Sequence, residues 1–121
     1  MKKILFFSFF TLILACKQEK DPKTELLYGK WQGSEWTVAG KPSGFDAKTV
    51  HFEFKSDASY EASFAGQAEK GTFRFQENKL YTTATGNKIE KMVALPKLTK
   101  DTIIMDMNRQ GQAEQLFLIK K

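Results

Sequence analysis

The sequence predicts an all-β protein, an eight-stranded antiparallel up-and-down barrel. From Tyr28 onward, short runs of alternating apolar and polar residues follow one another. Turn residues separate these runs at intervals of about 8–12 residues, which is typical of β-sandwiches and barrels. An open sheet with this many strands would leave two long edges exposed, and closure into a barrel removes both edges.

The alternation is clearest in the middle of the chain, where Val50, Phe52 and Phe54 alternate with His51 and Glu53. Because successive side chains of a strand point to opposite faces, such runs give one apolar wall and one polar wall. Most connections are short, so sequential strands are expected to pair as antiparallel neighbours. The predicted strands are 29–38, 48–55, 59–65, 68–76, 79–85, 88–95, 102–108 and 113–120.

Two of these strands have a less regular pattern. In 88–95, the apolar residues Ile89, Met92 and Val93 do not share a strict period. In 113–120, the run 116–119 is apolar on both faces. The last strand is therefore expected to be covered on both sides, and the N-terminal turn is one element that could cover it.

The N-terminus has the pattern of a signal peptide. Lys2 and Lys3 precede an apolar run at 4–14, which is too short to span a bilayer, and small Ala15 and then Cys16 follow. The ending Ile-Leu-Ala-Cys resembles the lipobox of bacterial lipoproteins, with a less usual Leu at its second position. This resemblance implies cleavage before Cys16 and thioether lipidation of Cys16, with acyl chains such as palmitate. The alternatives are an ordinary signal peptide or an N-terminal anchor with a chance Cys.

Three segments are expected: a signal peptide at 1–15, the lipidated Cys and a polar tether at 16–25, and a barrel domain at 26–121. Two or more acyl chains on one residue anchor a protein stably. Lys17 stands where many Gram-negative lipoproteins carry the Asp of inner-membrane retention, so the resemblance implies the outer membrane. Acidic Glu19 and Asp21 also resemble export signals of surface-exposed lipoproteins, and the membrane face stays open.

Composition narrows the classes of partner. The formal net charge is +5, and 17 of the 19 basic residues are Lys. Specific nucleic-acid sites favour the bidentate fork of Arg, so nucleic acid is not expected as a partner. The lysines alternate with acidic residues, as on a solvated surface. A single Cys excludes an internal disulfide, and the length fits one domain, expected to be a monomer.

The start of the domain carries a family resemblance. A short helical turn, expected to be capped by Asp21 and Pro22, precedes Gly29-Lys30-Trp31. A helical turn followed by Gly-x-Trp resembles the start of a lipocalin, which implies that Gly29 and Trp31 form the base of the barrel. The runs 52–60, 71–75 and 78–80 are similar to small lipocalin-like domains of bacterial lipoproteins.

The resemblance covers 26–121 and includes departures. Lipocalins commonly place an Arg near the last strand across this Trp, and here Lys120 or Lys121 would have to replace it. The usual disulfide and the C-terminal helix are absent. The family implies a barrel that binds a small hydrophobic ligand. The aromatic and Met side chains expected to form the core, and to line any pocket, are Trp36, Phe45, Phe52, Phe54, Tyr60, Phe64, Phe73, Phe75, Met105 and Met107.

The loop 39–47 lies where a lipocalin has its lid over the barrel mouth. Either Phe45 and Trp36 frame an opening there, or Phe45 plugs the barrel and Trp36 packs on the surface or in a neighbour. His51 is the single histidine, and it shares a strand face with Glu53. Two such residues do not make a zinc site, so His51 is expected to be an exposed strand residue without a functional role.

No nucleophile motif, metal cluster or phosphate loop appears in the sequence, and no enzyme activity or cofactor is expected. The sequence instead predicts an envelope lipoprotein whose barrel binds a small hydrophobic ligand without catalysis. The alternative is a barrel with a filled core that acts as a protein-interaction, accessory or inhibitor module. An enclosed cavity of a few hundred Å³, lined by the aromatic residues, would favour the first. A packed interior would favour the second.

Overall fold

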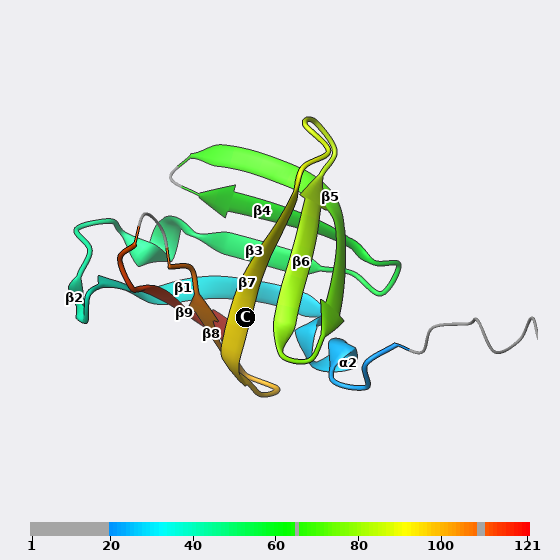
Figure 1. Ribbon diagram of the computed structural model, residues 1–121, viewed down its shortest axis with the longest axis horizontal. Coiled ribbons are helices and arrows are strands. Elements are labelled where there is room, and N and C mark those ends of the chain that lie inside the picture. The colour runs from blue at the N-terminus through cyan, green and yellow to red at the C-terminus, as the bar shows by residue number, and fades with distance from the viewer. Residues whose placement is uncertain (1–19, 65, 109–110) are drawn as a thin grey trace, which may run out of the picture.

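The computed structural model describes residues 20–64, 66–108 and 111–121 (Figure 1). Cys16 and the predicted signal peptide lie outside these residues. Within them, no helix is long and apolar enough to cross a membrane. The elements, in order, are α2 (Thr24–Leu27), β1 (Gly29–Val38), β2 (Lys41–Pro42), the 3₁₀ helix η2 (Ala47–Thr49), β3 (His51–Phe54), β4 (Ser59–Phe64), β5 (Gln67–Gln76), β6 (Lys79–Ala84), β7 (Glu90–Leu98), β8 (Thr102–Asp106) and β9 (Glu114–Lys120).

The strands form one closed antiparallel barrel, as predicted. Each strand from β3 to β8 pairs with the next along the chain, β1 pairs with β3, and β1 also pairs with β9. This last pairing removes the free edges that an open sheet would have. The two-residue strand β2 pairs only with the end of β1, at the rim, so eight strands make up the barrel itself.

The strand predicted at 48–55 starts later than expected. Lys48 and Thr49 belong to η2, and β3 begins at His51. Asp46 caps this turn: its side chain accepts a hydrogen bond from the Lys48 N–H at 3.1 Å, and its carbonyl accepts one from the Thr49 N–H at 3.1 Å. A capping Asp favours a helical turn over a strand at this position.

The strand predicted at 88–95 is displaced toward the C-terminus. Lys88 has a φ of +58° and belongs to the turn, whereas β7 continues through Pro96 to Leu98. The register with β8 shifts between Ala94 and Lys97, so Pro96 lies at a bulge, where a missing N–H is tolerated. The prediction that Pro96 ends the strand is therefore wrong.

The prediction that the last strand is covered on both faces is also wrong. Leu116 and Leu118 are fully buried inside the barrel, but Ile119 is 48% exposed on the outside. The N-terminal turn does not lie over this strand. Instead α2 contacts β5, and the backbone N–H of Glu77 donates to the Asp21 carboxylate at 3.2 Å.

The barrel has two different ends (Figure 1). At the closed end lie α2 and three hairpin turns, which join β3 to β4, β5 to β6 and β7 to β8. At the open end lie the other turns and the loop that carries β2 and η2. The interior between them holds one cluster of buried apolar side chains from all eight barrel strands and α2.

Candidate functional site

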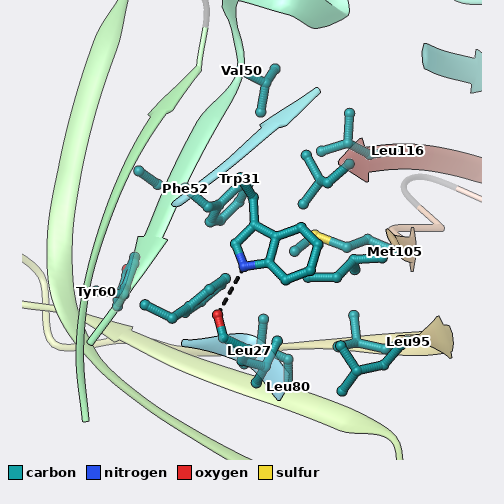
Figure 2. Packing of buried hydrophobic residues seen from close by; sticks show 14 of the residues in the cluster. Leu27, Trp31, Val50, Phe52, Tyr60, Leu80, Leu95, Met105 and Leu116 are labelled. Atoms are coloured by element: carbon teal, nitrogen blue, oxygen red, sulfur yellow. Dashed lines mark hydrogen bonds between the residues drawn. The ribbon is translucent and has the colours of Figure 1, made fainter. Parts of the chain in front are cut away.

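Trp31 lies inside the closed end and is fully buried (Figure 2). Its indole N–H donates to the Leu27 carbonyl at 2.8 Å, so α2 satisfies the polar atom of the ring. The Lys120 ammonium lies 4.5 Å from the ring centroid and donates to the Tyr28 carbonyl at 2.8 Å. Lys120 therefore contributes the cation–π contact for which lipocalins commonly use an Arg.

Gly29 gives Lys120 room to reach this position. Its φ is +124°, which side-chain-bearing residues rarely adopt, and an added Cβ would lie 2.8 Å from the Lys120 Cε. The spacing Gly-x-Trp thus has a local physical reason. The glycine lets the chain turn from α2 into β1, and two residues later the Trp points into the barrel.

The predicted pocket-lining residues mostly form core. Phe52, Phe54 and Phe73 contact one another through their rings, with centroid separations of 5.5 Å and 5.0 Å along the two contacts. Phe64 packs edge-on against Phe52 at 5.2 Å and is half-buried, as is Met107. The interior near the base is thus occupied by side chains. The predicted core and pocket-lining residues that are buried are Trp36, Phe52, Phe54, Tyr60, Phe73, Phe75 and Met105.

The loop at the open end covers Trp36. The Trp36 ring is buried, its N–H donates to the Glu114 carboxylate at 3.1 Å, and the Phe45 ring lies over it at 4.7 Å between centroids. Phe45 itself is 56% exposed, so it does not fill the barrel. The buried Ala47 of η2 packs instead against the inner side of β1 at Gly33.

One polar cluster faces inward at the open half of the barrel. The Tyr60 hydroxyl donates to the Glu69 carboxylate, and the Lys91 ammonium lies 3.6 Å from the other oxygen of that carboxylate. Glu69 is paired with buried Ala62 in the register of β4 and β5, which places it on the inner face. Burial first, and the Glu69 carboxylate second, raise the pKa of Tyr60 well above its ordinary value. Tyr60 therefore remains a neutral donor.

In the Tyr60→Phe variant, the free energy of unfolding is expected to fall less steeply with rising pH than in the wild type. A tyrosine whose pKa is raised on folding stabilises the fold fully below its unfolded pKa, about 10, and that contribution is lost as the pH rises above this value. Urea denaturation from about pH 8 to about pH 11 measures the slope. The matched control is Tyr81→Phe, because the Tyr81 ring lies outside the barrel against Arg74. Equal slopes in wild type and Tyr60→Phe would contradict this assignment.

A groove of about 530 Å³ lies on the outer face of β1, β3, β4 and β5. The strand register places four charged residues in one row across it: Lys30 opposite Glu53, Glu53 opposite Glu61, and Glu61 opposite Lys70. These residues alternate with buried side chains along their strands, so they point outward. The full lining comprises Lys30, Trp31, His51, Phe52, Glu53, Glu61, Ala62, Ser63, Ala68, Glu69, Lys70 and Lys121.

Lysines stabilise the charged form of the Glu61 carboxylate in this row. Lys55 forms an ion pair with Glu61 at 3.0 Å and, as the largest cause, lowers the pKa of the Glu61 carboxyl; Lys70 and Lys30 lower it further. Two glutamates directly opposite each other on neighbouring strands repel, and the flanking cations offset this repulsion. His51 is half-buried in the same groove, so it is less exposed than predicted. Within the described residues, no three acidic, His or Cys side chains group as a metal site.

Sequence reasoning missed this groove because its residues are far apart in the sequence. Alternation correctly assigns Glu53 and Glu61 to an outer face, but only the register brings Lys30, Glu61 and Lys70 into one row. The polar cluster was missed for a related reason. Glu69 and Lys91 belong to segments with weak alternation, where the sequence does not indicate which face a charged residue occupies.

A closed eight-stranded antiparallel barrel with a tryptophan at its base is the architecture of a lipocalin-type protein. A family model described as a lipocalin-like domain matches residues 27–105, more than half of the chain. The chain belongs to this family of lipocalin-like domains. A comparison with curated proteins gave no match.

Solved structures from Bacteroides share the fold. A lipocalin-like protein from Bacteroides uniformis ATCC 8492 has a TM-score of 0.62 at 13% identity, covering 79% of this chain and 99% of the other. An uncharacterized protein from Bacteroides eggerthii DSM 20697 has a TM-score of 0.60 at 16% identity, covering 78% and 99%. A DUF4847 family protein from Bacteroides vulgatus ATCC 8482 has a TM-score of 0.57 at 9% identity, covering 84% and 98%.

Proposed function

We propose that this protein is a lipoprotein of the bacterial envelope, anchored through acylated Cys16 to the outer membrane, whose barrel binds a partner without catalysis. The anchor is supported by the lipobox-like ending at Cys16 after a short apolar run. A binding role is supported by membership of the lipocalin-like family. A non-catalytic role is supported by the sequence, in which His51 is the single histidine and no nucleophile motif appears.

The partner that we propose is a protein, because the barrel interior is packed whereas the outer groove is open. Trp31, Phe54 and Tyr60 are almost fully buried inside the barrel. The row from Lys30 to Lys70 crosses four strands, which spans about 14 Å at a strand spacing of about 4.8 Å. This length fits about four residues of an extended chain.

The row of charges in the groove carries the proposal. Lys30, Lys70 and Lys121 bring three ammonium groups to a groove that has the carboxylates of Glu53 and Glu61, with a third carboxylate, Glu69, directed inward to Tyr60. The outer groove therefore presents more positive than negative charge. A net acidic, extended segment of a partner protein has complementary charge, which favours association and register.

Reversing two charges in the groove is expected to abolish partner binding. In the double variant Lys30→Glu/Lys70→Glu, only Lys121 remains as a cation of the groove lining, and the predominantly acidic groove repels an acidic segment. The full-length protein is expressed in its own host, extracted from membranes and examined by native mass spectrometry. A co-purifying protein is expected with the wild type and is expected to be lost from the double variant. The intact mass in the same spectra shows whether Cys16 is acylated.

A matched control keeps this test specific. Lys88→Glu/Lys97→Glu makes the same double charge reversal at exposed positions in and beside β7, outside the groove lining, and should keep the partner. A partner protein that remains bound to Lys30→Glu/Lys70→Glu would contradict the groove assignment. An unmodified Cys16 would contradict the lipid anchor independently of the groove.

The second candidate is a small apolar ligand at the open end of the barrel. The polar cluster of Tyr60, Glu69 and Lys91 favours it, because Phe64 and Phe52 provide an apolar surface close by in the strand order. Ligand pockets commonly combine apolar walls with a few converging polar groups. A co-purifying lipid or other small molecule in the same spectra, lost on Glu69→Gln but retained by Lys30→Glu/Lys70→Glu, would favour this candidate.

A further inference from the structure

We propose that the closed end of the barrel is a docking surface for anionic lipid headgroups, so that the open end is directed away from the membrane. The proposal rests on the lipid anchor proposed above and adds an orientation to it. Three observations carry it: the short distance between Cys16 and the closed end, the lysines that gather there, and a hollow with an unpartnered hydroxyl beside α2.

The chain can reach only a short way from the anchor to the barrel. Lys20 lies four positions after Cys16, and an extended chain spans at most about 3.6 Å per position, or about 14 Å in total. Lys20 is attached to the closed end, because its ammonium donates to the Tyr28 hydroxyl at 2.8 Å. The open end lies at the far ends of the strands, and the ten residues of β1 extend about 33 Å along their path.

Charged residues at the closed end favour an anionic surface. Asp21, Asp57 and Asp101 accept hydrogen bonds from backbone N–H groups or hydroxyls of their own turns. These three carboxylates therefore stabilise their own turns. Of the lysines there, Lys79, Lys100 and Lys121 are exposed, and Lys20 and Lys23 are exposed and donate to neutral groups. Lys55 pairs with Glu61, and Lys120 is half-buried over Trp31. Lysines close to an anionic membrane surface are attracted to it. The lysines of the closed end are Lys20, Lys23, Lys55, Lys79, Lys100, Lys120 and Lys121, and the acidic residues are Asp21, Glu25, Asp57, Glu77 and Asp101.

The closed end also has an incompletely filled hollow, with a few polar groups in a mainly apolar lining. About 220 Å³ lies between α2 and β5, next to Lys20, Asp21, Arg74 and the buried Thr24. The Thr24 hydroxyl has no hydrogen-bond partner among the described residues. A buried hydroxyl without a partner is unfavourable and is usually satisfied by another group. Lys20 and Arg74 together outweigh the single Asp21 carboxylate, so the charge beside this hydroxyl suits a phosphate oxygen of a lipid headgroup.

Two reporter positions test the orientation. Ser56→Cys places a thiol in the closed-end turn between β3 and β4, and Gly86→Cys places one in the open-end turn between β6 and β7. The mature acylated protein, labelled at this thiol with a fluorophore, is inserted into vesicles of phosphatidylethanolamine and phosphatidylglycerol that carry headgroup spin labels. Quenching is expected to be several-fold stronger at position 56 than at position 86. Equal quenching, or stronger quenching at position 86, would overturn the orientation.

Charge-reversal variants test the role of the lysines. Lys23→Glu/Lys79→Glu/Lys100→Glu removes three cations of the closed end and is expected to reduce the quenching difference several-fold. The matched control Lys41→Glu/Lys48→Glu/Lys88→Glu makes the same charge change at the open end and should preserve it. An unchanged difference in the first variant would overturn headgroup docking while leaving the anchor intact. An unmodified Cys16 in the intact mass would overturn the anchor and, with it, the docking proposal.

Discussion

Trp31→Ala is expected to be among the most destabilising single substitutions in this protein, with a loss of about 3–5 kcal/mol in the free energy of unfolding. The indole is fully buried, and its removal leaves a cavity between α2 and the barrel strands (Figure 2). The substitution also removes the partner of the Leu27 carbonyl and the ring beneath the Lys120 ammonium. For a domain of this size, the midpoint of thermal unfolding should fall by more than about 10 °C.

Two further variants show how much of the stability at the base comes from the Trp31 ring itself. Lys120→Met keeps an aliphatic chain over the ring but removes the charge and its hydrogen bond to the Tyr28 carbonyl. A cost of about 1–2 kcal/mol is expected for it, well below that of Trp31→Ala. Ile119→Ala removes an exposed apolar side chain and should change stability by less than about 0.5 kcal/mol. A Trp31→Ala protein that melts with the wild type would show that this ring does not hold the base.

The central hairpins could be predicted within a residue because their sequence is consistent at every level. Strand β4 alternates apolar and polar residues with a strict period of two, and Phe73 and Phe75 continue this alternation in the second half of β5. Between β5 and β6, Glu77 and Asn78 both have positive φ, as a tight two-residue hairpin turn requires. The local pattern and the turn residues agree here, and tertiary packing leaves the predicted strand boundaries almost unchanged.

The less accurate parts depend on tertiary contacts that no local pattern shows. Pro96 is tolerated within β7 because a bulge in the register with β8 places it where no ladder hydrogen bond is needed. The outer apolar residue Ile119 indicated a covering element, but α2 is held elsewhere, at the closed end, by the indole N–H of Trp31. Trp31, at the base of the barrel, thus helps to hold the N-terminal turn at the closed end.

The candidate sites also divide into features that the local sequence pattern indicates and features that depend on tertiary contacts. Sequence reasoning identified the apolar wall, and most of that wall is core. It could not identify the outer groove, because Lys30, Glu53, Glu61 and Lys70 become neighbours only through three successive strand pairings. A row of this kind follows from register, and register depends on the turns and bulges that set the offset of each strand.

Gly33→Ala is expected to cost about 1–3 kcal/mol and to loosen the loop over the open end. An added Cβ would lie 2.1 Å from the Ala47 carbonyl oxygen and 3.2 Å from the Val50 Cβ. The obstacle is backbone, so β1 and η2 would have to move apart. This separation would also weaken the hydrogen bond from the Gly33 N–H to the Val50 carbonyl, now 2.9 Å. Chemical denaturation measures the stability, and amide exchange at Val50 measures the loop.

Gly86→Ala is the matched control, because an added Cβ there meets no atom within 4 Å. Its stability should lie within about 0.5 kcal/mol of the wild type, which separates the effect of the clash from that of losing a glycine. Faster exchange at Val50 in Gly33→Ala alone would mean that close contact with β1 holds η2 in the barrel. If both variants are equally stable and exchange at Val50 is unchanged, the open end is not held in this way. The loop that covers Trp36 would then be free to move independently of the strand beneath it.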